Sequence, residues 1–141
     1  MRFRDLFSLK HILFAVVLVG LMMLFAVSHS NNMVKVKFQE ESIRISSSKY
    51  KITMEFEDIV SVALEDLAEP GQEKENCFDD EMLRTGLWEN DAWGSYYVCA
   101  DLDTTKCIVA RLHDGRVFVF SCKNDAKTEQ IYNDLLSKLN G

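Results

Sequence analysis

The sequence predicts one N-terminal transmembrane helix followed by a mainly β domain of six to seven short antiparallel strands, which ends in an α-helix. Three observations predict this class. An uncharged apolar run occupies residues 12–27, alternation of apolar and polar residues begins at Val34, and apolar side chains recur every four positions near the C-terminus. The length of 141 residues and the hydrophobic content of 48% suit one folded domain rather than a disordered chain.

The apolar run predicts a signal-anchor helix over residues 12–28, between a basic tail at 1–11 and a linker at 29–33. The run is slightly shorter than the roughly 20 residues that cross about 30 Å of hydrocarbon, so flanking apolar residues are expected to extend it. We therefore expect the lipid bilayer to be one partner of the chain.

Arg2, Arg4 and Lys10 favour a cytoplasmic N-terminus. The C-terminal domain, residues 34–141, is then extracytoplasmic on a single-pass protein of the cell membrane. The alternative is export after signal cleavage, since Ala26-Val27-Ser28 also resembles a small-residue cleavage site.

The first strands follow from the period-two pattern. Residues 34–38 and 42–46 alternate apolar with polar side chains around a turn at Glu40-Glu41, and two more strands are expected over 50–56 and 58–64. Acidic side chains then crowd residues 65–83, which predicts a solvated loop. The loop lacks the spacing of a calcium-binding motif, and the four cysteines contain no zinc-binding pair, so we expect neither a metal nor another cofactor.

Two further strands are expected around residues 87–99, with Asn90-Asp91 in the turn between them. This segment holds the candidate partner-binding residues Trp88, Trp93, Tyr96 and Tyr97. Four large aromatic side chains can fill a small barrel, or they can anchor a partner at the surface. Exposure of Trp88 and Trp93 would favour a binding surface, and burial of both would exclude it.

The last hairpin joins residues 107–112 to 116–122. Asp114-Gly115 predicts a two-residue type I′ turn, in which paired residue numbers sum to 229. Cys107 then faces Cys122 as a cross-strand cysteine pair on one side of the sheet. The pair falls at a hydrogen-bonded position, where side chains stand farther apart, and this favours free thiols over a disulfide.

The C-terminal helix is expected to begin at Asn124 or Asp125, either of which is a good N-cap. Ile131, Leu135 and Leu139 form its apolar stripe. A single helix of this length needs a surface to cover, and the sheet is the surface available.

Between Val34 and Leu139 the sequence resembles the bacterial pleckstrin-homology (PH) domains found on membrane-anchored proteins. The resemblance rests on the order of elements and on four short stretches, DIVSV at 58–62, RTG at 84–86, WGSY at 93–96 and DAKTEQIY at 125–132. It implies a PH-like barrel or sandwich and an adaptor rather than an enzyme. Eukaryotic relatives bind phosphoinositides through basic side chains of the first hairpin. The nearest counterparts are Lys35, Lys37 and Arg44, which Glu40 and Glu41 interrupt, so phosphoinositide binding is not expected.

Charge and motifs limit the function classes. Residues 31–141 hold 13 Lys and Arg against 21 Asp and Glu, a net charge of −8 that disfavours nucleic acid as a partner. None of the histidines lies in a recognisable catalytic motif, so we expect no catalytic activity and no catalytic residues.

Two functions remain. The first is a membrane-tethered interaction module that binds another protein through a strand edge or an aromatic patch. The alternative is an extracytoplasmic domain that senses a small ligand or lipid head group in a pocket with convergent basic groups. The negative charge of the domain favours the first.

Overall fold

The computed structural model describes residues 3–30 and 34–141, with side-chain environments for residues 9–24 and 34–141. The chain divides into two compact units, residues 1–31 and 32–141, which we describe separately. Residues 31–33 of the predicted linker lie outside the described residues.

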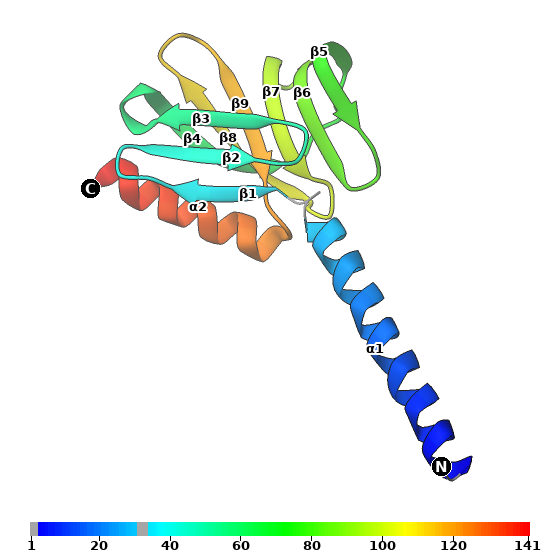
Figure 1. Ribbon diagram of the computed structural model, residues 1–141. Helices are drawn as coiled ribbons and strands as arrows, with labels where there is room; N and C mark the ends of the chain where they lie inside the picture. Colours follow the sequence, from blue (N-terminus) through cyan, green and yellow to red (C-terminus); the bar gives the residue numbers. More distant parts are fainter. Residues whose placement is uncertain (1–2, 31–33) are drawn as a thin grey trace. The chain divides into compact units, whose positions relative to one another are not determined.

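The first unit is the helix α1, Phe3–Ser30 (Figure 1). It contains the helix predicted over 12–28 and extends it at both ends. Its large apolar side chains between Leu9 and Leu24 are exposed, with fractions from 46% at Leu18 to 69% at Phe14. The transmembrane part of the prediction is not confirmed: among the described residues, no helix combines the length and apolar character that crossing a membrane requires.

The second unit begins with a three-stranded antiparallel sheet in the order β1-β2-β3. Its strands are β1 (Lys35–Phe38), β2 (Ser42–Ser46) and β3 (Lys51–Glu55). The predicted alternation is confirmed, because Ile43, Ile45, Ile52 and Met54 are buried while their neighbours in the sequence face outward. A short 3-10 helix, η1 (Phe56–Asp58), leads to the second sheet.

The second sheet has six strands in the order β4-β8-β9-β7-β6-β5. The strands are β4 (Ile59–Asp66), β5 (Gln72–Asp79), β6 (Leu83–Asn90), β7 (Gly94–Asp101), β8 (Lys106–Leu112) and β9 (Val117–Ser121). The described domain thus has nine strands rather than six or seven. Neighbouring strands of the six-stranded sheet pair antiparallel, except that β7 and β9 pair in parallel.

The predicted loop over 65–83 is wrong, because β5 lies within it. This strand is exposed over most of its length and has no apolar alternation, so its sequence carries no strand signal. Pairing with β6 creates it, with two register shifts. Gly86 makes this pairing possible: it has a φ of 109°, and a Cβ at that position would lie 2.5 Å from the carbonyl oxygen of Asn76.

The predicted register of the last hairpin is also wrong, by one residue. Paired numbers in β8 and β9 sum to 228, as in Ile108 with Phe120. The loop contains three residues, His113 to Gly115, and the amide of Leu112 bonds to the carbonyl of Arg116 at 3.0 Å. Gly115 closes the loop at a φ of 91°, as in hairpins that combine a type I turn with a bulge.

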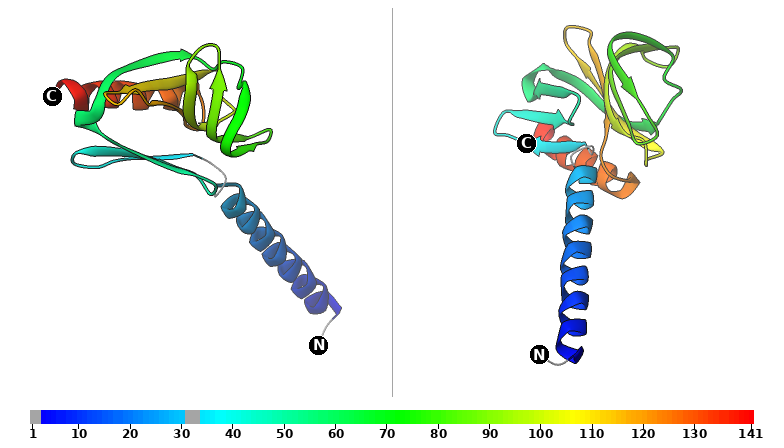
Figure 2. Two further views of the ribbon diagram at one scale, coloured as in Figure 1. Left: turned by 90° about the horizontal axis from the view of Figure 1, so that it is seen from above. Right: turned by 45° about the vertical axis from the view of Figure 1, so that its right-hand side comes forward.

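Two buried clusters cover the two faces of the six-stranded sheet. The first lies between this sheet and the three-stranded sheet, which form separate layers in the left view of Figure 2. The helix α2 (Asp125–Asn140) packs against β4 and β8, and its Ile131 and Leu135 join this cluster. Its N-cap is Asn124, as predicted, whose side chain accepts a hydrogen bond from the amide of Lys127 at 2.8 Å.

The second cluster lies beneath the crossover, the five residues 67–71 that join β4 at one edge of the six-stranded sheet to β5 at the other. Six flat strands would span about 24 Å, more than the roughly 20–22 Å that the chain from Asp66 to Gln72 can reach, so the sheet must curl. The hydroxyl of Tyr96 donates to the carbonyl of Pro70 at 2.7 Å, and the side chain of Asn90 donates to the carbonyl of Glu69 at 2.9 Å. These bonds hold the crossover on the sheet.

Candidate functional site

The four candidate aromatic residues do not form a surface. Trp88, Trp93 and Tyr96 are 3%, 7% and 1% exposed and belong to the second cluster. Tyr97 points to the opposite face of the sheet, where its ring stacks on Phe118. The burial of both tryptophans excludes the interpretation of this segment as a partner-binding patch.

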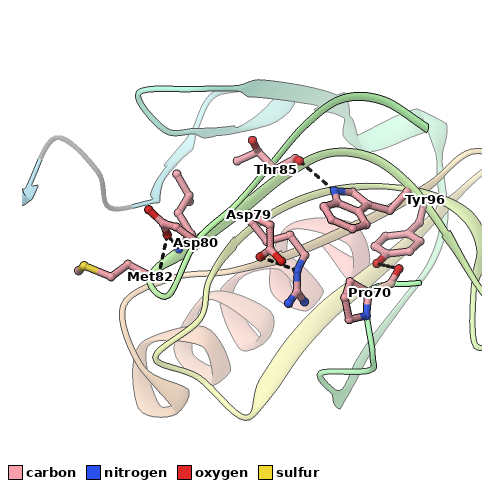
Figure 3. Close-up of polar contacts among 9 residues, drawn as sticks. Pro70, Asp79, Asp80, Met82, Thr85 and Tyr96 are labelled. Carbon is pink, nitrogen blue, oxygen red and sulfur yellow. Dashed lines mark hydrogen bonds and ion pairs between the residues drawn. The ribbon is translucent and has the colours of Figure 1, made fainter. Parts of the chain in front are cut away.

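Their polar atoms serve the fold instead. The indole of Trp88 donates to the carbonyl of Thr85 at 2.9 Å, and Tyr96 contacts Pro70, as Figure 3 shows. The indole of Trp93 donates to the carboxylate of Glu65 at 3.3 Å. These three side chains therefore fix β6, β7 and the crossover to one another.

The cysteine pair is not brought together. Cys107 lies in the second cluster and Cys122 in the first, because the one-residue change of register turns one of them to the other side of the sheet. All four cysteines are free. Burial raises the pKa of Cys99 and Cys107 to about 12 and also raises that of Cys122, so these three thiols stay protonated and unreactive at neutral pH.

Among the described residues, acidic side chains line two hollows on the surface of the β domain. The larger, of about 640 Å³, lies beside the crossover and is lined by Glu69, Glu89 and Asp91. The smaller, of about 260 Å³, is lined by four glutamates, Glu40, Glu41, Glu55 and Glu57, with Phe56. Neither has the convergent basic groups that an anionic ligand requires. Among the described residues, no three His, Cys, Asp or Glu side chains are placed to hold a metal ion.

The exposed side of the three-stranded sheet carries the opposite charge. Register places Lys35, Ser46 and Lys51 in one row across the sheet, and Lys37, Arg44 and Thr53 in the next. All these side chains face away from the buried Ile43 and Ile45 row. We call the four cations, Lys35, Lys37, Arg44 and Lys51, the basic face.

The basic face stands out against the charge of the domain. Residues 35–55, which contain the whole sheet, hold five basic and three acidic side chains, whereas residues 56–141 hold eight basic and eighteen acidic ones. Glu40 and Glu41 lie in the turn between β1 and β2, and Glu55 lies at the end of β3, opposite Ser42 and outside the two rows of cations. The sheet is therefore the positive part of a negative domain.

The cations of the basic face are not neutralised within the described chain. None of the four makes an ion pair there. Lys37 and Arg44 stand directly opposite each other on β1 and β2, an arrangement of like charges that destabilises a sheet. The Nε of Arg44 is buried and has no hydrogen-bond acceptor. The exposed ammonium groups of Lys35, Lys37 and Lys51 are therefore free to receive anionic side chains from outside.

Sequence reasoning identified three of these residues but not the site. It named Lys35, Lys37 and Arg44 and set them aside because two glutamates interrupt them in the sequence. Strand alternation was the signal that could have found the site, since it places all three on one side of a hairpin. Lys51 joins them only through the register of β3. No family model, curated protein or solved structure matches this chain.

Proposed function

We propose that this protein is a membrane-tethered protein-interaction module without catalytic activity, and that its β domain binds an acidic segment of a partner protein on the basic face. The observation that carries the proposal is the row of unneutralised cations on one exposed sheet of a negatively charged domain. Complementary charge gives such a surface its specificity and speeds association with an acidic partner.

Attachment to a membrane through α1 is supported by its apolar side chains. From Leu9 to Leu24 they remain exposed in the described chain, which leaves a large apolar surface to be buried elsewhere. Lipid is an environment that would bury the apolar stretch of the helix from Ile12 to Leu24. The basic residues near the N-terminus favour a cytoplasmic location for that end, with the β domain on the other side.

The absence of catalysis is supported by the surroundings of the reactive groups. Three of the four thiols are buried and protonated at neutral pH. His113 lies in the exposed turn between β8 and β9, beside the ion pair of Asp114 and Arg116. The described contacts therefore contain no nucleophile within hydrogen-bonding reach of a base.

We include a PH-like architecture in the proposal because of the order of the elements. A series of short strands is followed by one helix that packs on the sheet. The alternative function, sensing of a small ligand or lipid head group, has less support because both hollows are lined by acidic side chains. It would require the basic face itself to bind the anionic group.

The test uses the full chain in nanodiscs of neutral lipid and a fluorescent peptide of ten glutamates, with binding followed by anisotropy. We expect salt-sensitive binding, and we expect the double variant Lys35→Glu/Lys37→Glu to weaken it about tenfold or more, since each exposed ion pair contributes about 0.2–1 kcal/mol and reversal replaces attraction with repulsion. The matched control is Lys127→Glu/Lys138→Glu, which makes the same charge change at exposed positions of α2.

Equal weakening by both double variants would show that net charge, and not the basic face, governs binding. A second titration uses glycerol phosphate. Binding of this head group at the basic face without binding of the peptide would favour the sensor function instead.

A further inference from the structure

The outer edge of β3 is open and regular. In the three-stranded sheet β3 pairs only with β2, and all five of its residues do so without a register shift. Figure 1 shows β3 as the uppermost strand of that sheet, with its outer edge turned away from β2. Proteins usually protect such edges with bulges, prolines or covering elements, because an open regular edge pairs with other chains.

The other sheet edges differ from β3. β5 is interrupted by two register shifts and a positive φ at Asn76, and β4 has a register shift between Ile59 and Ser61 and packs against α2. β1 has only four residues, and antiparallel pairing with its own copy would set Lys35 against Lys37. Of the strand edges that the structure describes, β3 is therefore the one best suited to pairing.

The sequence of β3 is complementary to itself. Read antiparallel about Thr53, Lys51 of one strand faces Glu55 of the other, Ile52 faces Met54, and Thr53 faces Thr53. Opposite charges and paired threonines are both favourable cross-strand neighbours. The charged and hydroxyl side chains lie on the exposed side, whereas Ile52 and Met54 are 3% and 1% exposed on the core side.

The complementarity is confined to the strand. Lys49 lies in the bend between β2 and β3, and Phe56 and Glu57 lie in η1, so neither end continues the extended edge. The five residues of β3 therefore match their own copy at every position when the pairing is centred on Thr53.

We infer that two copies of this chain pair antiparallel through the open edges of β3, with a two-fold axis at Thr53, and join their three-stranded sheets into one of six strands. Within the five residues of the strand, only this register sets a lysine against a glutamate. A shift by one residue would set core-facing against solvent-facing side chains, and a shift by two would break both Lys51–Glu55 pairs. The contact is isologous and closes as a dimer.

The pairing goes beyond the proposed function and does not depend on it. Because the two-fold axis of an antiparallel strand pair stands perpendicular to the sheet, the two basic faces would lie on the same side of the joined sheet. A dimer would then present two sites for one acidic partner, with the gain in avidity that linked sites provide.

The test is a charge swap, followed by sedimentation of the full chain in a neutral detergent. We expect Lys51→Glu and Glu55→Lys each to raise the dimer dissociation constant about tenfold or more, since two-fold symmetry places two like-charge pairs in each dimer. The double variant Lys51→Glu/Glu55→Lys restores both pairs with reversed signs, and we expect it to dimerise like the original chain.

A cross-link measures the register itself. In a Cys77→Ser background, we expect a short bismaleimide to link two Thr53→Cys chains into a dimer, while Lys37→Cys on the other edge of the sheet is not linked. Failure of the charge-swapped double variant to recover dimerisation would overturn the inference, as would a dimer that neither single variant weakens or a chain that stays monomeric. Binding of the glutamate peptide is tested with the Lys35 and Lys37 variants, whereas dimerisation is tested with the Lys51, Glu55 and Thr53 variants. Either proposal can therefore fail without the other.

Discussion

Replacing Tyr96 by phenylalanine tests whether the aromatic segment supports the fold or a partner. The change removes one hydroxyl from a side chain that is 1% exposed and deletes its 2.7 Å hydrogen bond to the carbonyl of Pro70. The ring remains, together with its edge contact to Trp93 at 5.0 Å between centroids. The lost bond and the carbonyl left without this donor should together lower the free energy of unfolding by about 1–2 kcal/mol.

The assay is urea unfolding of the full chain in neutral detergent, followed by tryptophan fluorescence, since both Trp88 and Trp93 lie in the cluster beneath the crossover. The matched control is Tyr97→Phe, the same chemical change one residue away on the other face of the sheet, where no described hydrogen bond is lost. We expect that control to change stability by less than about 0.5 kcal/mol. Faster cleavage after Leu67 by chymotrypsin would locate the loosening in the crossover.

The stability of the Tyr96→Phe variant should also depend differently on alkaline pH. Burial raises the pKa of Tyr96 from its usual value near 10 to about 12, so the neutral phenol is favoured in the folded state. Its contribution to stability is complete below pH 10 and is lost as the pH rises from 10 to 12. Tyr96→Phe should therefore show a shallower loss of stability across this range. If Tyr96→Phe and Tyr97→Phe behave alike in both experiments, the crossover is not held by Tyr96 and our reasoning is refuted.

Three further predictions concern the β domain. The partly exposed Cys77 should react first with a maleimide, whereas Cys99 and Cys107 should react only on unfolding or as the pH rises from 9 towards 12. Their raised pKa values also make the free energy of unfolding fall over this pH range. Mass spectrometry measures the labelling, and fast labelling of Cys107 in the native protein would contradict the prediction. Asp101→Ala should lower the free energy of unfolding in urea by about 2–4 kcal/mol, because the buried carboxylate accepts hydrogen bonds from the amides of Val34 and Lys123 at 3.2 and 2.7 Å. A loss below about 1 kcal/mol would argue against that role. Gly86→Ala should lower the thermal midpoint far more than Gly94→Ala, since both have positive φ but only Gly86 has backbone within 3 Å of the new Cβ, and similar midpoints would show that the close approach is unimportant.

The sequence by itself determined the elements whose signals are local. Alternation located β1, β2 and β3, the turn at Glu40-Glu41 joined the first two, and Asn124 marked the start of α2. These features succeed as predictors because each depends on neighbours two to four residues away. The self-complementarity of residues 51–55 is also present in the sequence, although its meaning depends on the open edge that the structure shows.

Tertiary structure alone decided the features that depend on distant partners. β5 exists because β6 supplies its hydrogen bonds, and β7 pairs in parallel with β9 although the two are separated by a whole strand in the sequence. The loop before Arg116 has three residues rather than two, and this puts Cys107 and Cys122 on opposite faces of the sheet. A one-residue change of register turns a strand side chain to the other face. The curled sheet and its crossover together bury Trp88 and Trp93, and the register of β3 puts Lys51 in the same row as Ser46 and Lys35. Burial and neighbourhood across strands are set by contacts that no local pattern encodes.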